Sequence, residues 1–154
     1  MIENNNEPHI LLVEDDQSQA DLMMLGLRSD GGGFTIDHVV DGVEAMAYIR
    51  KQDSYAGAPT PDVVFLDLNL PRLSGLEVLE QVKADPNLQQ IPVVILSTSE
   101  NESDLMNAYA RGVNSYVKKP VGFDRFQQMC KDLRQFWTVR NMSPRQQQEE
   151  RKAA

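Results

Sequence analysis

The residues with the clearest chemical potential are acids that directly follow short apolar runs. Residues 10–16 read ILLVEDD, so Glu14 and Asp15 come immediately after an apolar segment. Residues 63–67 read VVFLD and end in Asp67. A carboxylate at the end of a buried segment is costly unless it has a partner or a task. Because carboxylates about 4 Å apart repel by roughly 4 kcal/mol at an effective dielectric of 20, acids brought together here would require a cation.

A hydroxyl and an amine follow two further apolar runs. Ser97 comes after residues 93–96, and Lys119 follows the short run 116–117 within the sequence YVKKP. Oxygen ligands without a neighbouring His or Cys favour a hard ion such as Mg²⁺. A carboxylate can attack a phosphoryl group, whose oxygens a metal ion and a lysine can neutralise. Any one of these residues alone could be structural, but together they predict phosphoryl transfer at a shared site.

The elements that would hold these residues alternate between strands and helices. Four apolar runs are too short for helices and read as buried strands, at residues 10–13, 63–66, 93–96 and 116–117. Residues 34–40 alternate in polarity like a half-exposed edge strand, which makes His38 a strand side chain rather than a ligand. The β-α order repeats five times, which predicts the α/β class with a doubly wound parallel sheet. The strand ends would then share one rim.

Helical spacing of apolar residues fills the segments between the strands. The motif SGLE at residues 74–77 and the motif SENE at residues 99–102 both fit a capping box, which marks a helix start. The last helix should continue to about Val139, because its apolar stripe extends to Trp137. The buried side of this stripe includes Cys130, which we expect to be a core thiol.

Composition limits the classes of function. The chain has 154 residues, enough for one domain, and a formal net charge of -8. This charge argues against binding to nucleic acid or to acidic membranes. A single cysteine cannot form an internal disulfide, and the sequence carries neither a signal peptide nor a membrane span. We therefore expect a cytoplasmic protein.

The chain divides into one domain and two short flanks. Residues 1–7 form an N-terminal arm, and residues 8–140 form the domain. Residues 141–154 are polar and rich in glutamine, which predicts a disordered tail.

The motifs resemble those of response-regulator receiver domains, the phospho-acceptors of two-component signalling. ILLVEDD, DLNLPRLSG, ILSTS and YVKKP occur in the family's order, and the resemblance covers about residues 8–138. It implies a flavodoxin-like, five-stranded parallel sheet of order 2-1-3-4-5. It also implies that a sensor histidine kinase donates a phosphoryl group to Asp67, and that Mg²⁺ is bound by Asp15, Asp67 and the backbone carbonyl of Asn69, with Glu14 holding the ion through water.

The resemblance also assigns the residues around the phosphoryl group. Lys119 would pair with its oxygens, Ser97 would hydrogen-bond one of them, and Tyr116 would turn inward as Ser97 moves. Thr98 replaces a smaller apolar residue beside the phosphate and could slow access to it. The bond between Lys119 and Pro120 would be a cis peptide.

Two further positions concern the acidic rim and the lifetime of the phosphate. Asp16 is an additional acid, which we interpret as a surface residue in preference to an indirect role at the metal site. Asn69 and Ser99 stand at the two variable positions that modulate dephosphorylation in the family.

A narrower similarity is to the small stand-alone regulators that partner cyanobacterial and bacterial phytochrome kinases. It rests on HVVDGVEAMAYIR, KADPNLQQIPVVILSTSENESDL and the terminal FW. The similarity implies a homodimer through the face formed by the fourth helix, the last strand and the last helix. The aromatic bulk of the last helix fits this idea, although such stripes also occur in cores.

Two other classes of function are weighed against a phosphorylation switch. An adaptor would use the fold without phosphorylation, but no site position is missing. A Mg²⁺-dependent phosphatase of the haloacid dehalogenase type would need a second Asp two residues after Asp67, where Asn69 stands. We therefore expect a signalling protein rather than an enzyme.

Overall fold

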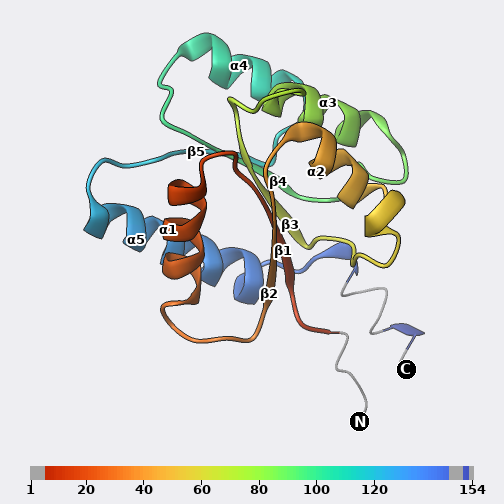
Figure 1. The fold of residues 1–154 in the computed structure, drawn as a ribbon, viewed down its shortest axis with the longest axis horizontal. Helices are drawn as coiled ribbons and strands as arrows, with labels where there is room; N and C mark the ends of the chain where they lie inside the picture. Colours follow the sequence, from red (N-terminus) through yellow and green to blue (C-terminus); the bar gives the residue numbers. More distant parts are fainter. Residues whose placement is uncertain (1–5, 146–150, 153–154) are drawn as a thin grey trace.

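Five short strands form a parallel sheet that lies between two layers of helices (Figure 1). The computed structural model describes residues 6–145 and 151–152. The strands are β1 (His9–Val13), β2 (Thr35–Val39), β3 (Val63–Asp67), β4 (Val93–Ser97) and β5 (Ser115–Lys118). Their order is β2-β1-β3-β4-β5 with every pair parallel, which confirms the predicted fold class and strand order.

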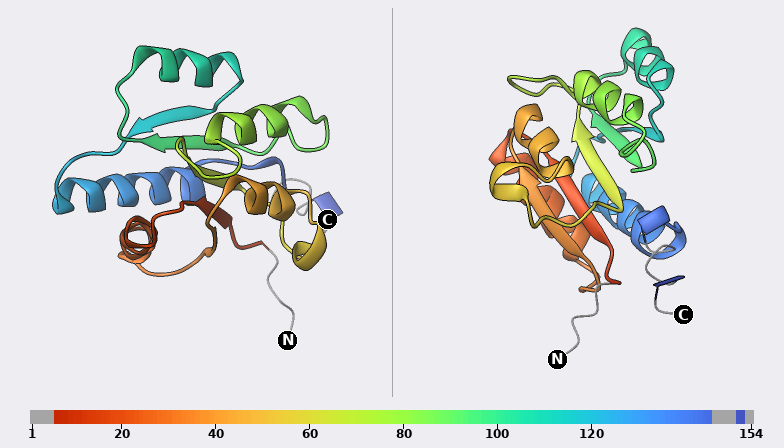
Figure 2. Two further views of the ribbon diagram at one scale, coloured as in Figure 1. Left: turned by 45° about the horizontal axis from the view of Figure 1, so that its top comes forward. Right: turned by 90° about the vertical axis from the view of Figure 1, so that its right-hand side faces the viewer.

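The helices follow the strands in the predicted alternation. They are α1 (Gln17–Arg28), α2 (Gly42–Ile49), α3 (Gly75–Ala84), α4 (Glu102–Ala110) and α5 (Phe123–Arg134), with a short 3₁₀ helix at Asp53–Tyr55. Helices α1 and α5 cover one face of the sheet, and α2, α3 and α4 lie on the other side (Figures 1 and 2). This doubly wound arrangement leaves the strand ends open at one rim.

The core consists of two apolar layers, one on each face of the sheet. In β1, Ile10 and Leu12 join the layer under α1 and α5, whereas Leu11 and Val13 join the opposite layer. Successive strand residues point to opposite faces, so a strand buried on both faces must be apolar throughout. This requirement explains why the central strands could be recognised from continuous apolar runs. Cys130 of α5 is fully buried in the first layer, as expected.

One of the two predicted capping boxes is confirmed. The Ser74 side chain accepts a hydrogen bond from the Glu77 backbone N–H, and the Glu77 side chain accepts one from the Ser74 backbone N–H. The box predicted at Ser99 is wrong, because α4 is capped by Asn101, whose side chain accepts from the backbone of Ser103. Asn is as good an N-cap as Ser and stands closer to the helix, so it takes this position.

The C-terminal segment differs from the prediction. The helix continues past α5 as a π-helix at Gln135–Arg140, close to the predicted end. Residues 141–145, expected to be part of a disordered tail, instead pack on the domain. Ser143 is buried, and Arg145 pairs with Asp62 at 2.8 Å. The polar composition of this segment predicted disorder. Its polar side chains Ser143 and Arg145 are instead ordered because they bond Asp62, which is itself buried.

Residues 146–150 and 153–154 of the predicted tail lie outside the described residues. Residues 1–5 of the predicted N-terminal arm lie outside them too. Within the described part of the chain, none of the helices is both long enough and apolar enough to span a membrane.

Candidate functional site

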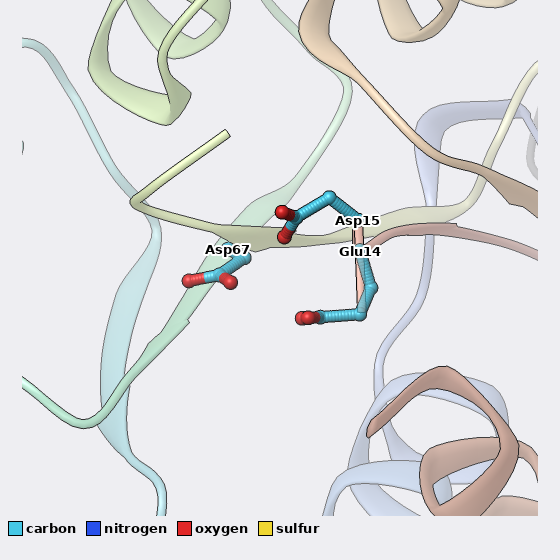
Figure 3. Close-up of side chains that lie close together, drawn as sticks. All are labelled: Glu14, Asp15 and Asp67. Atoms are coloured by element: carbon cyan, nitrogen blue, oxygen red, sulfur yellow. The ribbon is translucent and has the colours of Figure 1, made fainter. Parts of the chain in front are cut away.

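The predicted acids meet at the carboxyl-terminal rim of the sheet. Glu14 and Asp15 directly follow β1, and Asp67 is the last residue of the neighbouring strand β3. One carboxylate oxygen from each of the three residues lies within 4.8 Å of the others. Figure 3 shows the side chains of Glu14 and Asp15 extending from the β1 end toward Asp67. Adjacent parallel strands thus create the acidic cluster that the sequence predicts.

Lys119 supplies a positive charge to this cluster. Its Nζ lies 3.2 Å from Glu14 Oε2 and 3.9 Å from Asp67 Oδ2. The pairing with Glu14 is buried, because the Lys119 and Glu14 side chains are only 8% and 5% exposed. Burial raises the pKa of Glu14, and the nearby Asp67 charge adds to this effect, whereas Lys119 opposes it. One lysine therefore contacts two of the three carboxylates, and the cluster keeps an excess of negative charge.

The donor set fits a hard divalent cation. It consists of carboxylate oxygens, two of them on half-buried or exposed side chains that a hydrated ion can reach. Mg²⁺ prefers one or two carboxylates together with waters and phosphate oxygens. Asn69, the residue expected to add its backbone carbonyl, lies exposed beside Asp67 and donates its N–H to Asp67 Oδ1 at 3.4 Å. Its carbonyl as a ligand stays a prediction.

The predicted switch residues share one partner, Ser99. The Ser97 hydroxyl is buried and accepts a hydrogen bond from the Ser99 backbone at 3.0 Å. The hydroxyl of the half-buried Tyr116 donates to the carbonyl oxygen of Ser99 at 3.2 Å. Because both hydroxyls contact the Ser99 backbone, a movement of Ser97 would change the position of the acceptor that Tyr116 uses. Thr98 lies between Ser97 and Ser99 in sequence and is exposed.

The geometry of the Lys119 backbone corrects one expectation. The peptide bond between Lys119 and Pro120 is trans and not cis. Both isomers of a bond before proline lie within about 1 kcal/mol of each other, so the residue types alone do not decide between them. Lys119 nevertheless reaches the acids, and its backbone N–H donates to the Ser97 carbonyl at 2.8 Å.

Two residues near the acids have roles that the sequence did not reveal. Asp16 caps α1, because its side chain accepts a hydrogen bond from the backbone of Gln19 at 3.1 Å. An N-cap signal at the start of the next helical pattern could have identified this role. His38 is a strand residue as expected, but its Nε2 also lies 2.7 Å from the carbonyl oxygen of Glu14. No sequence signal marks this contact, because it depends on the register of β2.

Gly75 allows the first turn of α3 to pack against the end of β3. A Cβ at this position would lie 2.3 Å from the Asp67 carbonyl oxygen. We expect Gly75→Ala to lower the free energy of unfolding by about 2 kcal/mol, because β3 or α3 must shift. Urea-induced unfolding will measure this. Gly57→Ala is the control, since among the described residues a Cβ there meets no atom within 4 Å. Equal stabilities of the two variants would contradict the argument.

Comparisons with known proteins agree with this geometry. The family model for the response regulator receiver domain matches residues 10–131. The response regulator Rcp1 of Synechocystis sp. is 39% identical over 142 residues, which are 89% of this chain and 94% of that protein. A structure of the phosphorylated cyanobacterial phytochrome response regulator RcpA is 40% identical, with a TM-score of 0.86 over 90% of this chain and 99% of that chain.

A second solved structure is that of a metal-bound relative. The Mn²⁺-bound form of Rcp1 is 36% identical, with a TM-score of 0.84 over 89% of this chain and 99% of that chain. The regulators of phytochrome systems are thus among the relatives of this protein. Fold, rim chemistry and sequence agree, and the chain belongs to the response regulator receiver family of two-component signalling.

Proposed function

We propose that this protein is a phosphorylation-driven signalling switch that accepts a phosphoryl group on Asp67 in a Mg²⁺-dependent reaction. The observation that carries the proposal is the meeting of Asp67 with Glu14, Asp15 and Lys119 at one rim of the sheet. Family membership implies a sensor histidine kinase as the donor. In the reaction an Asp67 carboxylate oxygen bonds to phosphorus as the phosphorus–nitrogen bond of the donor histidine breaks, and the leaving nitrogen takes up a proton.

Each residue at the rim has a part in this reaction. Asp15, Asp67 and the Asn69 carbonyl would hold Mg²⁺, with Glu14 acting through water. The bound ion supplies positive charge against the phosphoryl oxygens. Lys119 adds a further positive charge, with its Nζ 3.9 Å from Asp67 Oδ2. The excess negative charge of the cluster supports this assignment.

The signal would leave the site through the segment after β4. Ser97 exchanges its hydrogen bond with the Ser99 backbone for one to a phosphoryl oxygen, and Tyr116 then loses its fixed acceptor on Ser99. The change shifts the equilibrium between two arrangements of the α4-β5-α5 surface. Thr98, exposed at the start of this segment, would influence access to the phosphate.

The proposed binding partner of this surface is a second copy of the chain. A groove of about 680 Å³ lies along β5 and α5, with Val117, Met129 and Trp137 among its lining residues. Phe136 at its border is 50% exposed, and Met106 on α4 is 62% exposed. Large apolar side chains at an open groove favour a protein partner. We therefore propose a homodimer through α4-β5-α5.

The phytochrome relatives favour a phytochrome-type histidine kinase as the phosphoryl donor of this protein, for which we propose a cytoplasmic location. The acidic net charge of -8 favours protein partners over nucleic acid or acidic membranes. An enzyme that turns over phosphate esters is the less favoured alternative, because Asn69 stands where such an enzyme would need its acid.

The test combines phosphorylation with assembly. The wild type, Asp67→Ala and Asp16→Asn are incubated with Mg²⁺ and acetyl phosphate, followed by intact mass and size-exclusion elution. We expect the wild type and Asp16→Asn to gain one phosphoryl group and to elute earlier, and Asp67→Ala to do neither. Asp16→Asn is the matched control because Asn also caps a helix. Phosphorylation of Asp67→Ala would contradict the acceptor, and continuous release of inorganic phosphate from p-nitrophenyl phosphate would favour the enzyme.

A further inference from the structure

His38 reaches the proposed metal site from the edge strand β2. Its Nε2 lies 2.7 Å from the carbonyl oxygen of Glu14. A carbonyl oxygen can only accept a hydrogen bond, so Nε2 must carry the hydrogen and donate it. The carbonyl belongs to the peptide unit that joins Glu14 to Asp15, the two acids at the end of β1. The imidazole of His38 therefore restrains the peptide unit that links Glu14 and Asp15.

The contact between His38 and Glu14 lies where β2 ends. The ladder between β1 and β2 ends at Glu14, whose N–H donates to the carbonyl oxygen of Val39 at 3.1 Å. β2 ends at Val39, and the N–H of the following residue, Val40, donates to a carboxylate oxygen of Glu44 at 3.2 Å. The side chain of His38 thus supplies a donor to the Glu14 carbonyl at the point where β2 ends.

Two other contacts of this segment involve the Glu14 side chain. The Asp16 N–H donates to Glu14 Oε1 at 3.3 Å, and Asp16 itself caps α1. Lys119 forms an ion pair with the other carboxylate oxygen of Glu14 at 3.2 Å. Both contacts act on the Glu14 side chain, whereas His38 acts on the peptide unit itself.

We propose that His38 is a positioning residue, which orients the peptide unit between Glu14 and Asp15 so that both carboxylates face Asp67. The proposal rests on the proposed function, because it concerns the same metal site. Partners that orient metal ligands typically change metal affinity 10-fold to 100-fold when removed. His38 touches the backbone and not a ligand atom, so we expect the lower end of this range, about tenfold.

The experiment compares three variants with the wild type in a Mn²⁺ titration at pH 8, with free Mn²⁺ measured by electron paramagnetic resonance. His38→Phe keeps a ring of similar size and removes the donor, whereas His38→Gln keeps an N–H donor. Thr35→Val is the control on the same strand, since it removes the hydroxyl that bonds the ring of His9 at the other end of β2. Thermal unfolding midpoints without metal show how much each variant is destabilised.

We expect His38→Phe to raise the dissociation constant for Mn²⁺ about tenfold. His38→Gln should recover most of the affinity, and Thr35→Val should bind like the wild type even where its unfolding midpoint falls. Wild-type affinity in His38→Phe, or equal losses in His38→Phe and His38→Gln, would overturn the positioning role alone. Failure of the wild type itself to bind Mn²⁺ would overturn the proposed metal site, and the role of His38 with it.

Discussion

Replacing Lys119 with methionine is expected to tighten Mg²⁺ binding about tenfold while slowing phosphoryl transfer to Asp67 about 100-fold. The two effects have opposite signs because the ammonium group repels the metal ion and attracts the phosphoryl oxygens. Its Nζ lies 3.2 Å from Glu14 and 3.9 Å from Asp67, so it competes with a cation for the same carboxylates. Methionine keeps most of the length of the side chain and removes the charge.

The size of each effect follows from electrostatics. Unit charges 4 Å apart interact by roughly 4 kcal/mol at an effective dielectric of 20, and a net change of about 1.4 kcal/mol already gives tenfold in affinity. Loss of one fixed group that stabilises developing charge typically slows a reaction by about 100-fold to 1000-fold. The tighter binding of Mg²⁺ is therefore not expected to compensate for the slower phosphoryl transfer to Asp67.

Isothermal titration with Mg²⁺ at pH 8 and the rate of mass increase with acetyl phosphate measure the two quantities. At this pH, protons compete least with the metal for Glu14, whose pKa is raised by burial. Lys118→Met is the matched control, because Lys118 is the neighbouring lysine and pairs with the exposed Glu100 outside the cluster. An unchanged rate in Lys119→Met would contradict its role, and weaker Mg²⁺ binding would contradict the electrostatic explanation.

Asp62→Ala is expected to lower the free energy of unfolding by about 3 kcal/mol. Asp62 precedes β3 at the rim opposite to the acids and is only 2% exposed. Its carboxylate accepts hydrogen bonds from the backbone of His9 at 2.7 Å, from the Ser143 hydroxyl, and from Arg145 at 2.8 and 2.9 Å. Removing one member of a buried charge pair leaves the other member charged and poorly solvated. This costs more free energy than the loss of the attraction between the two charges.

Urea-induced unfolding followed by the fluorescence of Trp137 measures this loss. Arg72→Ala is the control, because it breaks the pair with Asp41 at 3.2 Å, in which the Arg72 side chain is 60% exposed. Exposed pairs contribute less than about 1 kcal/mol. Equal stabilities of the two variants would mean that the packing of residues 141–145 adds nothing to the stability of the domain.

The fold and most of the site could be predicted because they depend on local patterns. Continuous apolar runs identify strands that are buried on both faces, and the residue after each run must then lie at the shared rim. This reasoning places Asp67, Ser97 and Lys119 correctly at the strand ends. The predicted cap of α4, Ser99, and its actual cap, Asn101, lie two residues apart, which is the usual uncertainty of a helix boundary.

The remaining features depend on pairs that are distant in sequence. Asp62 and Arg145 are 83 residues apart, and neither residue alone indicates a buried charge pair. The contact between His38 and Glu14 joins residues 24 apart and exists only in one register of the edge strand. Composition describes each segment by itself, and it does not show which polar groups will meet in the folded chain.

The charge pair at Asp62 has a practical consequence for how the protein can be attached to labels or surfaces. Arg145 also donates to the backbone carbonyl of Glu7 at 3.1 Å, so residues near the two ends of the domain meet beside Asp62. Since parallel strands all run the same way, this meeting point lies a full strand length from the acidic rim. A dye or an immobilising linker attached at this meeting point would lie far from the rim at which we propose phosphorylation.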